Sequence, residues 1–282
     1  MKLQRAVTSS QRVVKTFQVS ISPPSEVESL TSEASPTTHT HLFKIIEILP
    51  QVHIWPSAML LSAYLLARSQ EFHGKVVLDL GAGCGLTSLA ASVTGCKHVY
   101  STERRDEKDL IDNLQDIVAL NKREGLIPSD ASIEVVPFSW RSHGEVRHST
   151  FQQLFKIGSE SQHKHIDIIL GSDVFYSGED IDPILTVVHE LALENPSLIF
   201  YTSYQQRSTS RSISPFLGKY GMKAQVVDSS AFLHPYHLQL QVMQGMCRDD
   251  EEQCEEACND TLQFEDLQDI CLIKIYRLDL DG

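Results

Sequence analysis

Apolar residues follow two spacings, which alternate along most of this chain. Short apolar runs typical of buried strands alternate with stretches in which apolar residues recur every three or four positions, as on one face of a helix. The expected strands are residues 76–80, 98–103, 133–138, 166–171, 198–203, 222–227 and 271–278, with helices between them and one more before them, from Pro56. Because strands that alternate with helices form parallel sheets, the pattern predicts an α/β domain with a mostly parallel sheet between two helical layers.

The N-terminal part of the chain has a different pattern. The first forty or so residues are rich in Ser, Thr and Pro, and within them Phe17, Val19 and Ile21 alternate as expected of an edge strand or a hairpin arm. Residues 23–40 are expected to be a mobile connection. We therefore divide the chain into an N-terminal extension, residues 1–41, and one domain, residues 42–282, which contains an acidic loop insertion at residues 247–268.

The strand at residues 76–80 runs into a glycine-rich turn. Gly81, Gly83 and Gly85 alternate with Ala82 and Cys84, and the residues that follow have helical spacing. Glycine lets the backbone turn sharply and approach a ligand closely. A strand, a glycine loop and a helix in this order indicate a nucleotide-type site at a helix N-terminus, although the same glycines also suit a purely structural turn.

The spacing of the glycines distinguishes among nucleotides. A dinucleotide site needs Gly-x-Gly-x-x-Gly, whose last glycine would fall at Leu86, and a P-loop needs a Gly-Lys-Ser/Thr sequence that is absent. An NAD-dependent oxidoreductase is therefore disfavoured. The sequence Asp79-x-Gly-x-Gly-x-Gly instead resembles the first motif of seven-stranded S-adenosylmethionine-dependent methyltransferases. Glu103 ends the next expected strand, at about the offset at which an acidic residue binds ribose hydroxyls.

A second group of candidates follows the strand at residues 166–171. Ligands of such sheets bind at the carboxyl ends of the strands, so we expect Ser172, Asp173 and Tyr176 beside the glycine loop. Asp173 either orients a cationic nucleophile or caps the next helix. Trp140 either covers the adenine face of a cofactor or is a core residue, and Trp55 either closes the cofactor pocket or packs its helix against the sheet.

The net charge of the chain limits the classes of molecule that it is expected to bind. The net charge is −13, and residues 249–266 hold nine carboxylates and no Lys or Arg. This argues against direct nucleic-acid binding, which usually requires a basic surface. The acidic stretch is either a solvated loop or an attractor of a basic protein. The longest apolar run, around residues 58–67, is interrupted by Ser62 and is too short to span a membrane.

Cysteine usage indicates a reducing compartment. The six cysteines are scattered without the density of a disulfide scaffold, so we expect reduced thiols in the cytosol or nucleus. Cys247, Cys254 and Cys258 do not have the spacing of a zinc site, and no metal is expected. Cys84 is a candidate reactive thiol because of its position at a helix N-terminus.

These motifs resemble lysine methyltransferase family sixteen, a group of protein methyltransferases with a seven-stranded sheet. The resemblance rests on Trp55-Pro56, the loop from Asp79 to Gly85, Ser139-Trp140 and Asp173-x-x-Tyr176, and it covers roughly residues 50–232 and the last strand. It implies a Rossmann-like class I methyltransferase sheet with helices on both faces, and it places Asp173 and Tyr176 at the substrate as catalytic residues. The implied S-adenosylmethionine contacts are Trp55, Gly81, Gly83, Glu103, Trp140 and Ser172, and we count Asp79 and Gly85 of the glycine-loop motif with them as cofactor-binding candidates.

The resemblance also bears on the substrate. Within the family, segments such as residues 202–208 are most similar to a member described as a histone-arginine methyltransferase of the nucleus and cytoplasm. We therefore expect a protein arginine N-methyltransferase with a basic substrate, such as a histone tail, in transcriptional regulation. The two-glutamate clamp of the well-known arginine methyltransferases has no counterpart here, which keeps lysine methylation as an alternative. A scaffold without catalysis that binds a basic partner is the alternative from another class. The oligomeric state is not predicted.

Overall fold

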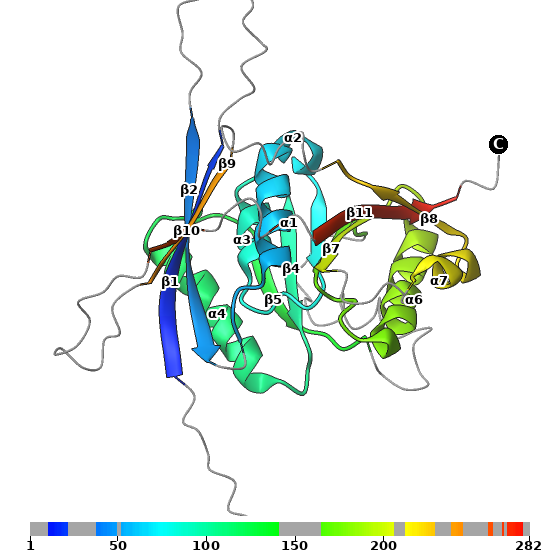
Figure 1. The fold of residues 1–282 in the computed structure, drawn as a ribbon, viewed down its shortest axis with the longest axis horizontal. Coiled ribbons are helices and arrows are strands. Elements are labelled where there is room, and N and C mark those ends of the chain that lie inside the picture. Colours follow the sequence, from blue (N-terminus) through cyan, green and yellow to red (C-terminus); the bar gives the residue numbers. More distant parts are fainter. Residues whose placement is uncertain are drawn as a thin grey trace, which may run out of the picture.

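A computed structural model contains a seven-stranded sheet and a separate four-stranded sheet (Figure 1). The structure describes residues 11–21, 38–49, 52–140, 165–205, 212–228, 238–244, 259–261, 267 and 270–278. Residues 141–164 and most of the acidic stretch at residues 249–266 lie outside these ranges.

The seven-stranded sheet has the order β5-β4-β3-β6-β7-β11-β8. Its first five strands in this order are parallel to one another, whereas β11 is antiparallel to both of its neighbours, β7 and β8. The strands are β3 (Val76–Asp79), β4 (His98–Glu103), β5 (Ile133–Pro137), β6 (Ile168–Ser172), β7 (Ile199–Gln205), β8 (Met222–Val226) and β11 (Ile270–Arg277). The mostly parallel sheet predicted from the sequence is confirmed, and the order reverses at β3, where ligands bind in such sheets.

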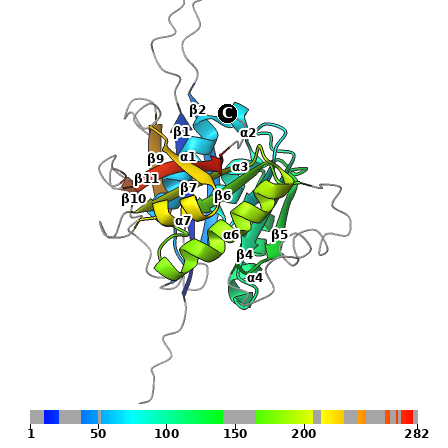
Figure 2. The same ribbon diagram turned by 90° about the vertical axis from the view of Figure 1, so that its right-hand side faces the viewer.

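Helices cover both faces of this sheet, as the alternating pattern predicted. On one face lie α1 (Pro56–Ala67), α2 (Ser69–Phe72), α3 (Leu86–Ser92) and α4 (Lys108–Arg123), and on the other α6 (Gly178–Glu194) and α7 (Ser214–Lys219), which Figure 2 shows from their own side. Successive strand residues belong to different cores, since Val77 packs with the first helical layer and Val76 and Leu78 with the second. None of the described helices is long and apolar enough to cross a membrane.

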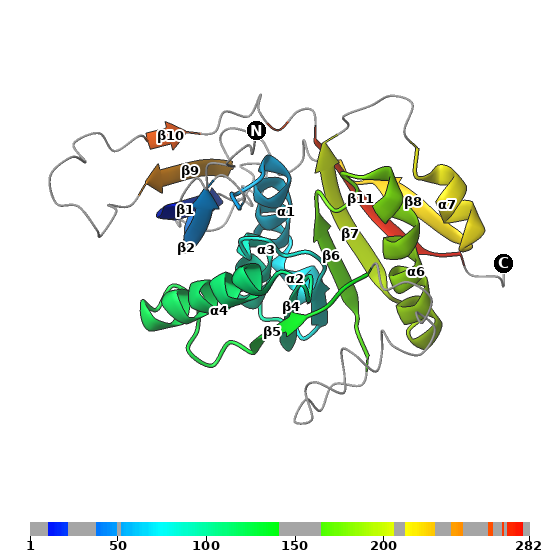
Figure 3. The ribbon, with the colours of Figure 1, turned by 90° about the horizontal axis from the view of Figure 1, so that it is seen from below.

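The four-stranded sheet has the order β10-β9-β1-β2 and lies on the side of α1, α3 and α4 (Figure 3). It consists of β1 (Gln11–Ile21), β2 (His39–Leu49), β9 (Leu238–Gln244) and β10 (Asn259–Thr261), all paired antiparallel. The strand expected around Phe17 is present as one arm of the antiparallel pair β1–β2, and it is not an edge strand, because β1 lies between β2 and β9. A domain boundary between residues 41 and 42 stays a prediction, and it would pass through β2.

Helix α4 covers the outer edge of β2 with two asparagines. The side chain of Asn121 accepts a hydrogen bond from the backbone N–H of Lys44 at 2.9 Å and donates to the carbonyl of Lys44 at 2.6 Å. Asn113 donates to the carbonyl of Ile46 at 2.9 Å. Backbone groups at a sheet edge pair readily with other chains, so these side chains close an edge that would otherwise invite association.

Candidate active site

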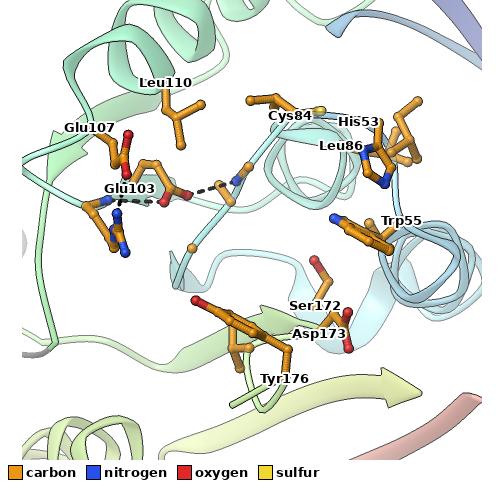
Figure 4. A pocket seen from close by; sticks show the side chains of 18 of the residues that line it. His53, Trp55, Cys84, Leu86, Glu103, Glu107, Leu110, Ser172, Asp173 and Tyr176 are labelled. Carbon is orange, nitrogen blue, oxygen red and sulfur yellow. Dashed lines mark hydrogen bonds and ion pairs between the residues drawn. The ribbon is translucent and has the colours of Figure 1, made fainter. Parts of the chain in front are cut away.

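A cavity of about 580 Å³ opens at the carboxyl ends of the parallel strands (Figure 4). This volume is in the usual range for small-molecule and cofactor sites. Its wall comes from the loop between β3 and α3, the ends of β4, β6 and β7, the start of α4 and the segment before α1. The lining residues are Val52, His53, Ile54, Trp55, Ala58, Gly81, Ala82, Gly83, Cys84, Leu86, Glu103, Arg104, Glu107, Leu110, Trp140, Ser172, Asp173, Val174, Tyr176 and Gln205.

The glycine loop presents its backbone to the cavity. Gly81, Gly83 and Gly85 all have positive φ, at 64°, 55° and 71°, which side chains other than glycine rarely adopt. A Cβ at Gly83 would meet nothing within 4 Å, so a side chain there would project into open space. A Cβ at Gly81 would lie 2.9 Å from Cη2 of Trp140, and one at Gly85 would lie 2.5 Å from Cδ1 of Leu114. The first two glycines line the cavity, whereas Gly85 packs against α4 and does not.

Asp79 lies beneath the loop and does not line the cavity. Its side chain is fully buried, and its Oδ2 accepts hydrogen bonds from the hydroxyls of Thr87 at 2.5 Å and Ser88 at 2.6 Å. Burial raises the pKa of Asp79 from 3.8 to about 6, against the lowering effect of those hydrogen bonds. In this structure Asp79 ties the end of β3 to the first turn of α3, and a direct contact of Asp79 or Gly85 with a cofactor stays a prediction.

Glu103 extends from the end of β4 into the cavity wall. Its Oε2 accepts a hydrogen bond from the backbone N–H of Gly83 at 3.1 Å, and its Oε1 accepts one from the N–H of Arg104 at 3.2 Å. The side chain is only 7% exposed, and burial raises the pKa of this carboxyl above its usual value. Arg104 also pairs with Glu107, so the guanidinium is neutralised at the same end of the cavity.

Trp140 is both a core residue and a cavity residue, so the two interpretations of this position are compatible. The ring is 6% exposed and packs in the core on the α6 side. Its Nε1 donates a hydrogen bond to Oδ1 of Asp180 at 3.0 Å. This bond, together with the contact at Gly81, fixes the plane of the ring along the cavity wall.

Asp173 has an unusual backbone at the end of β6. It is the one described residue other than glycine with positive φ, at 55°, and its N–H donates to the carbonyl of Ser203 on β7 at 2.6 Å. The cap of α6 is Ser177, whose hydroxyl accepts from the N–H of Glu179 at 3.3 Å, so Asp173 is not the N-cap of that helix. Left-handed residues in such turns are typical of functional sites. The structure thus removes the capping alternative for Asp173.

Aromatic side chains flank this end of the cavity. Trp55, at the N-terminus of α1, is 47% exposed, and Tyr176 is 49% exposed. Figure 4 shows both rings, with Asp173 and Ser172, around the same space, while Glu103 and Glu107 lie at the opposite end. The ring of His53 lies over that of Trp55, with 4.1 Å between centroids and a tilt of 45°. Trp55 therefore forms a wall of the cavity and is not buried between helix and sheet.

Cys84 is not the reactive thiol that its position suggested. Its side chain is 5% exposed, and burial raises the pKa of the thiol, with the charges of Glu47 and Glu103 adding to the effect. The thiolate is the nucleophilic form, so a thiol with a raised pKa is unreactive at neutral pH. Among the residues that the structure describes, no cluster of three or more His, Cys, Asp and Glu is placed to hold a metal ion.

Most of the residues expected from the sequence meet in this one cavity. Those that line it are Trp55, Gly81, Gly83, Glu103, Trp140, Ser172, Asp173 and Tyr176. Sequence reasoning did not identify His53, Arg104, Glu107, Leu110 or Gln205. Arg104 and Gln205 follow the rule of strand ends, since one comes directly after β4 and the other ends β7. His53 could have been found from its place two residues before Trp55.

Comparison with known proteins agrees with this architecture. A family model described as "Lysine methyltransferase" matches residues 51–219. Histone-arginine methyltransferase METTL23 of Mus musculus is 28% identical over 229 residues, which cover 74% of this chain and 82% of that protein. The protein of the same name from Rattus norvegicus is 30% identical over 189 residues, which cover 67% of this chain and 75% of that protein. Protein N-terminal and lysine N-methyltransferase efm7 of Aspergillus fumigatus is 27% identical over 157 residues, which cover 54% of this chain and 56% of that protein.

The family model covers more than half of the chain, and its range includes the glycine loop, Glu103, Trp140 and the Asp173-x-x-Tyr176 motif. The seven-stranded sheet is the fold that the resemblance implied, and the cavity lies at its switch point. The chain therefore belongs to the lysine methyltransferase family, and it is a protein methyltransferase whose cofactor is S-adenosylmethionine.

Proposed function

We propose that this protein methylates arginine side chains in a basic protein, and that histone tails are the first substrates to examine. The observation that carries the proposal is the buried carboxylate of Asp173 beside two half-exposed aromatic rings, Trp55 and Tyr176. A carboxylate attracts a cationic side chain, and aromatic faces accept a cation without requiring its full hydration. The names of the mouse and rat relatives favour arginine and histones.

The described residues fit the cofactor. The space at Gly83 leaves room for a ligand against the backbone, and a buried carboxylate at Glu103 suits ribose hydroxyls, which donate hydrogen bonds. In our proposal Gly81, Gly83 and Glu103 hold the ribose and methionine parts, Trp140 covers the adenine, and Ser172 and Trp55 line the end where the methyl group lies. The cofactor supplies a methyl group on a positively charged sulfur.

Asp173 and Tyr176 act on the substrate in this proposal. Asp173 orients the cationic side chain so that its reacting nitrogen faces the methyl group, which is catalysis by positioning. As the nitrogen–methyl bond forms and the sulfur–methyl bond breaks, the nitrogen gives up one proton to the carboxylate of Asp173 or to water. Tyr176 lines the entrance, and together with Trp55 it excludes water from the reacting nitrogen. The positive φ of Asp173 sets the direction in which its side chain leaves the backbone.

Lysine methylation is the second candidate, and two observations favour it. The matching family model is described as lysine methyltransferase, and the relative from Aspergillus fumigatus is named for lysine and N-terminal methylation. A carboxylate between aromatic rings accommodates an ammonium as well as a guanidinium. We also propose, from the resemblance alone, that the protein acts in the nucleus and cytoplasm in transcriptional regulation. A non-catalytic scaffold is the remaining alternative.

Transfer of a labelled methyl group separates these candidates. The protein is incubated with methyl-labelled S-adenosylmethionine and core histones, and the labelled residue is identified by mass spectrometry. We expect methylarginine, formed about 10²-fold more slowly by Asp173→Asn. Methyllysine with arginine unlabelled would reject the arginine proposal and keep the lysine candidate. Binding of the cofactor without transfer to histones or to a cell lysate would favour the scaffold.

A further inference from the structure

A buried carboxylate of the four-stranded sheet reaches the wall of the cofactor cavity. The side chain of Glu47, on β2, is 2% exposed. Its Oε1 accepts a hydrogen bond from the backbone N–H of Ile54 at 2.9 Å, and its Oε2 lies 2.9 Å from Nζ of Lys15 on β1. Ile54 belongs to the cavity wall, whereas Glu47 and Lys15 do not.

This wall depends on β2 for its shape. After β2 the chain folds back, and Ile48 and Val52 exchange two backbone hydrogen bonds of 2.9 and 2.7 Å. Residues 52–55 then run along the cavity, and all four of them line it. The bond to Glu47 is a third attachment of this segment to β2. It lies next to the two residues whose rings face the cavity, His53 and Trp55.

The charge of Glu47 also acts on the glycine loop. Its charge contributes to the raised pKa of Cys84, which belongs to the glycine loop and lines the cavity. A buried charge is costly unless it is paired, and Lys15 pairs with it from the neighbouring strand, where it stands diagonally across the register from Glu47.

We propose that Glu47 is a positioning residue of the cofactor site, which holds residues 52–55 in place through the N–H of Ile54. Lys15 offsets the cost of burying the charge of Glu47, but it does not itself hold residues 52–55 in place. The four-stranded sheet is therefore part of the cofactor site and not an appendage to the methyltransferase fold. This inference concerns the cofactor, so it holds whether arginine or lysine is methylated.

The test separates the hydrogen bond from the ion pair. The double variant Lys15→Met/Glu47→Met replaces the buried pair by apolar side chains of similar size, a change that often leaves a protein equally or more stable. We expect its melting temperature to stay close to that of the wild type, because the gain from removing two buried charges offsets the cost of leaving the N–H of Ile54 without an acceptor. Its Kd for S-adenosylhomocysteine, measured by calorimetry, should rise about tenfold, the scale of one lost hydrogen bond to a charged group. A Kd within twofold of the wild type would overturn the proposal.

Two further variants complete the test. Lys15→Met/Glu47→Gln removes both charges but keeps an oxygen for the N–H of Ile54, so its Kd should return to within about threefold of the wild type. A tenfold loss in this variant would also overturn the proposal, and it can be measured even if the first variant does not fold. Lys44→Met/Glu124→Met removes an ion pair between β2 and α4, away from the cavity, and should leave the Kd unchanged.

Discussion

At the scale of single residues, Asp173 gives the sharpest test of the site. Asp173→Asn keeps the shape and the tolerance of positive φ but removes the charge. We expect normal folding and cofactor binding, with kcat/KM lower by about 10²-fold, as for the loss of a positioned electrostatic group. Glu179→Gln, an exposed carboxylate in the first turn of α6, is the matched control. Normal methylation by Asp173→Asn would show that the carboxylate has no part in catalysis.

Glu103 should matter for the cofactor rather than for the substrate. Glu103→Ala removes a buried carboxylate that also holds the N–H of Gly83. We expect binding of S-adenosylhomocysteine to weaken by about 1.5–3 kcal/mol, the scale of hydrogen bonds to a charged group. Glu134→Ala changes a partly exposed carboxylate on the neighbouring strand β5, outside the cavity, and should leave the calorimetric Kd unchanged. Equal Kd values for the two variants would contradict the assignment.

Asp79 gives the protein a pH-dependent stability. Because the pKa of Asp79 is raised from 3.8 to about 6 on folding, the folded state binds the proton more tightly than the unfolded state. The resulting stabilisation is complete below about pH 4 and is lost as the pH rises through about 6. Between pH 7 and pH 5 the wild type should therefore gain about 1 kcal/mol over Asp79→Asn. Melting curves of both proteins at the two pH values check this, and a constant difference would refute it.

At the scale of elements, one side of the glycine loop lines the cavity and the other side packs against α4. Gly83→Ala and Gly85→Ala share the strain of positive φ, about 1–2 kcal/mol. The methyl at residue 83 enters open cavity, whereas the methyl at residue 85 meets Leu114. We expect Gly83→Ala to weaken cofactor binding at least tenfold, and Gly85→Ala to lower the melting temperature further than Gly83→Ala does. The reverse order of the two effects would contradict the structure.

The helices and strands that could be predicted from the sequence are those whose apolar spacing lies within the element itself. The strand, turn and helix that follow Val76 were predicted correctly, because the strand and the helix each bury an apolar face whose spacing is visible in the sequence. Strand β2 was not predicted, since its polar start merges with the Ser- and Thr-rich segment before it. Strands β9 and β10 were missed because only their pairing with β1, at the other end of the chain, defines them.

The same distinction applies to the candidate site. Strand ends meet at one edge of a parallel sheet, which is why Glu103, Trp140 and Asp173 could be placed together from sequence. Spacing does not tell which side of a turn faces the cavity, so Asp79 and Gly85 could not be separated from Gly81 and Gly83. The role of Asp180 also depends on a tertiary contact, because its carboxylate accepts a hydrogen bond from Trp140.

At the scale of the whole molecule, the acidic stretch should act through its field. Residues 249–256 hold six carboxylates, and changing them to Asn and Gln would reduce the net charge from −13 to −7. If the substrate is basic, KM should rise and depend less on salt, since exposed charges steer partners through screened interactions. The Kd for S-adenosylhomocysteine is the internal control. An unchanged KM at low salt would show that this stretch does not attract the substrate.

The position of β11 determines how the protein tolerates shortening. This strand is the last described element along the chain, yet it lies inside the sheet, between β7 and β8. A premature stop codon before residue 270 would remove the shared partner of both strands and expose two unpaired edges, which promote aggregation. Such a product should be cleared by cellular quality control. Genetic variants that terminate translation just before residue 270 are therefore expected to be as damaging as those that terminate it early.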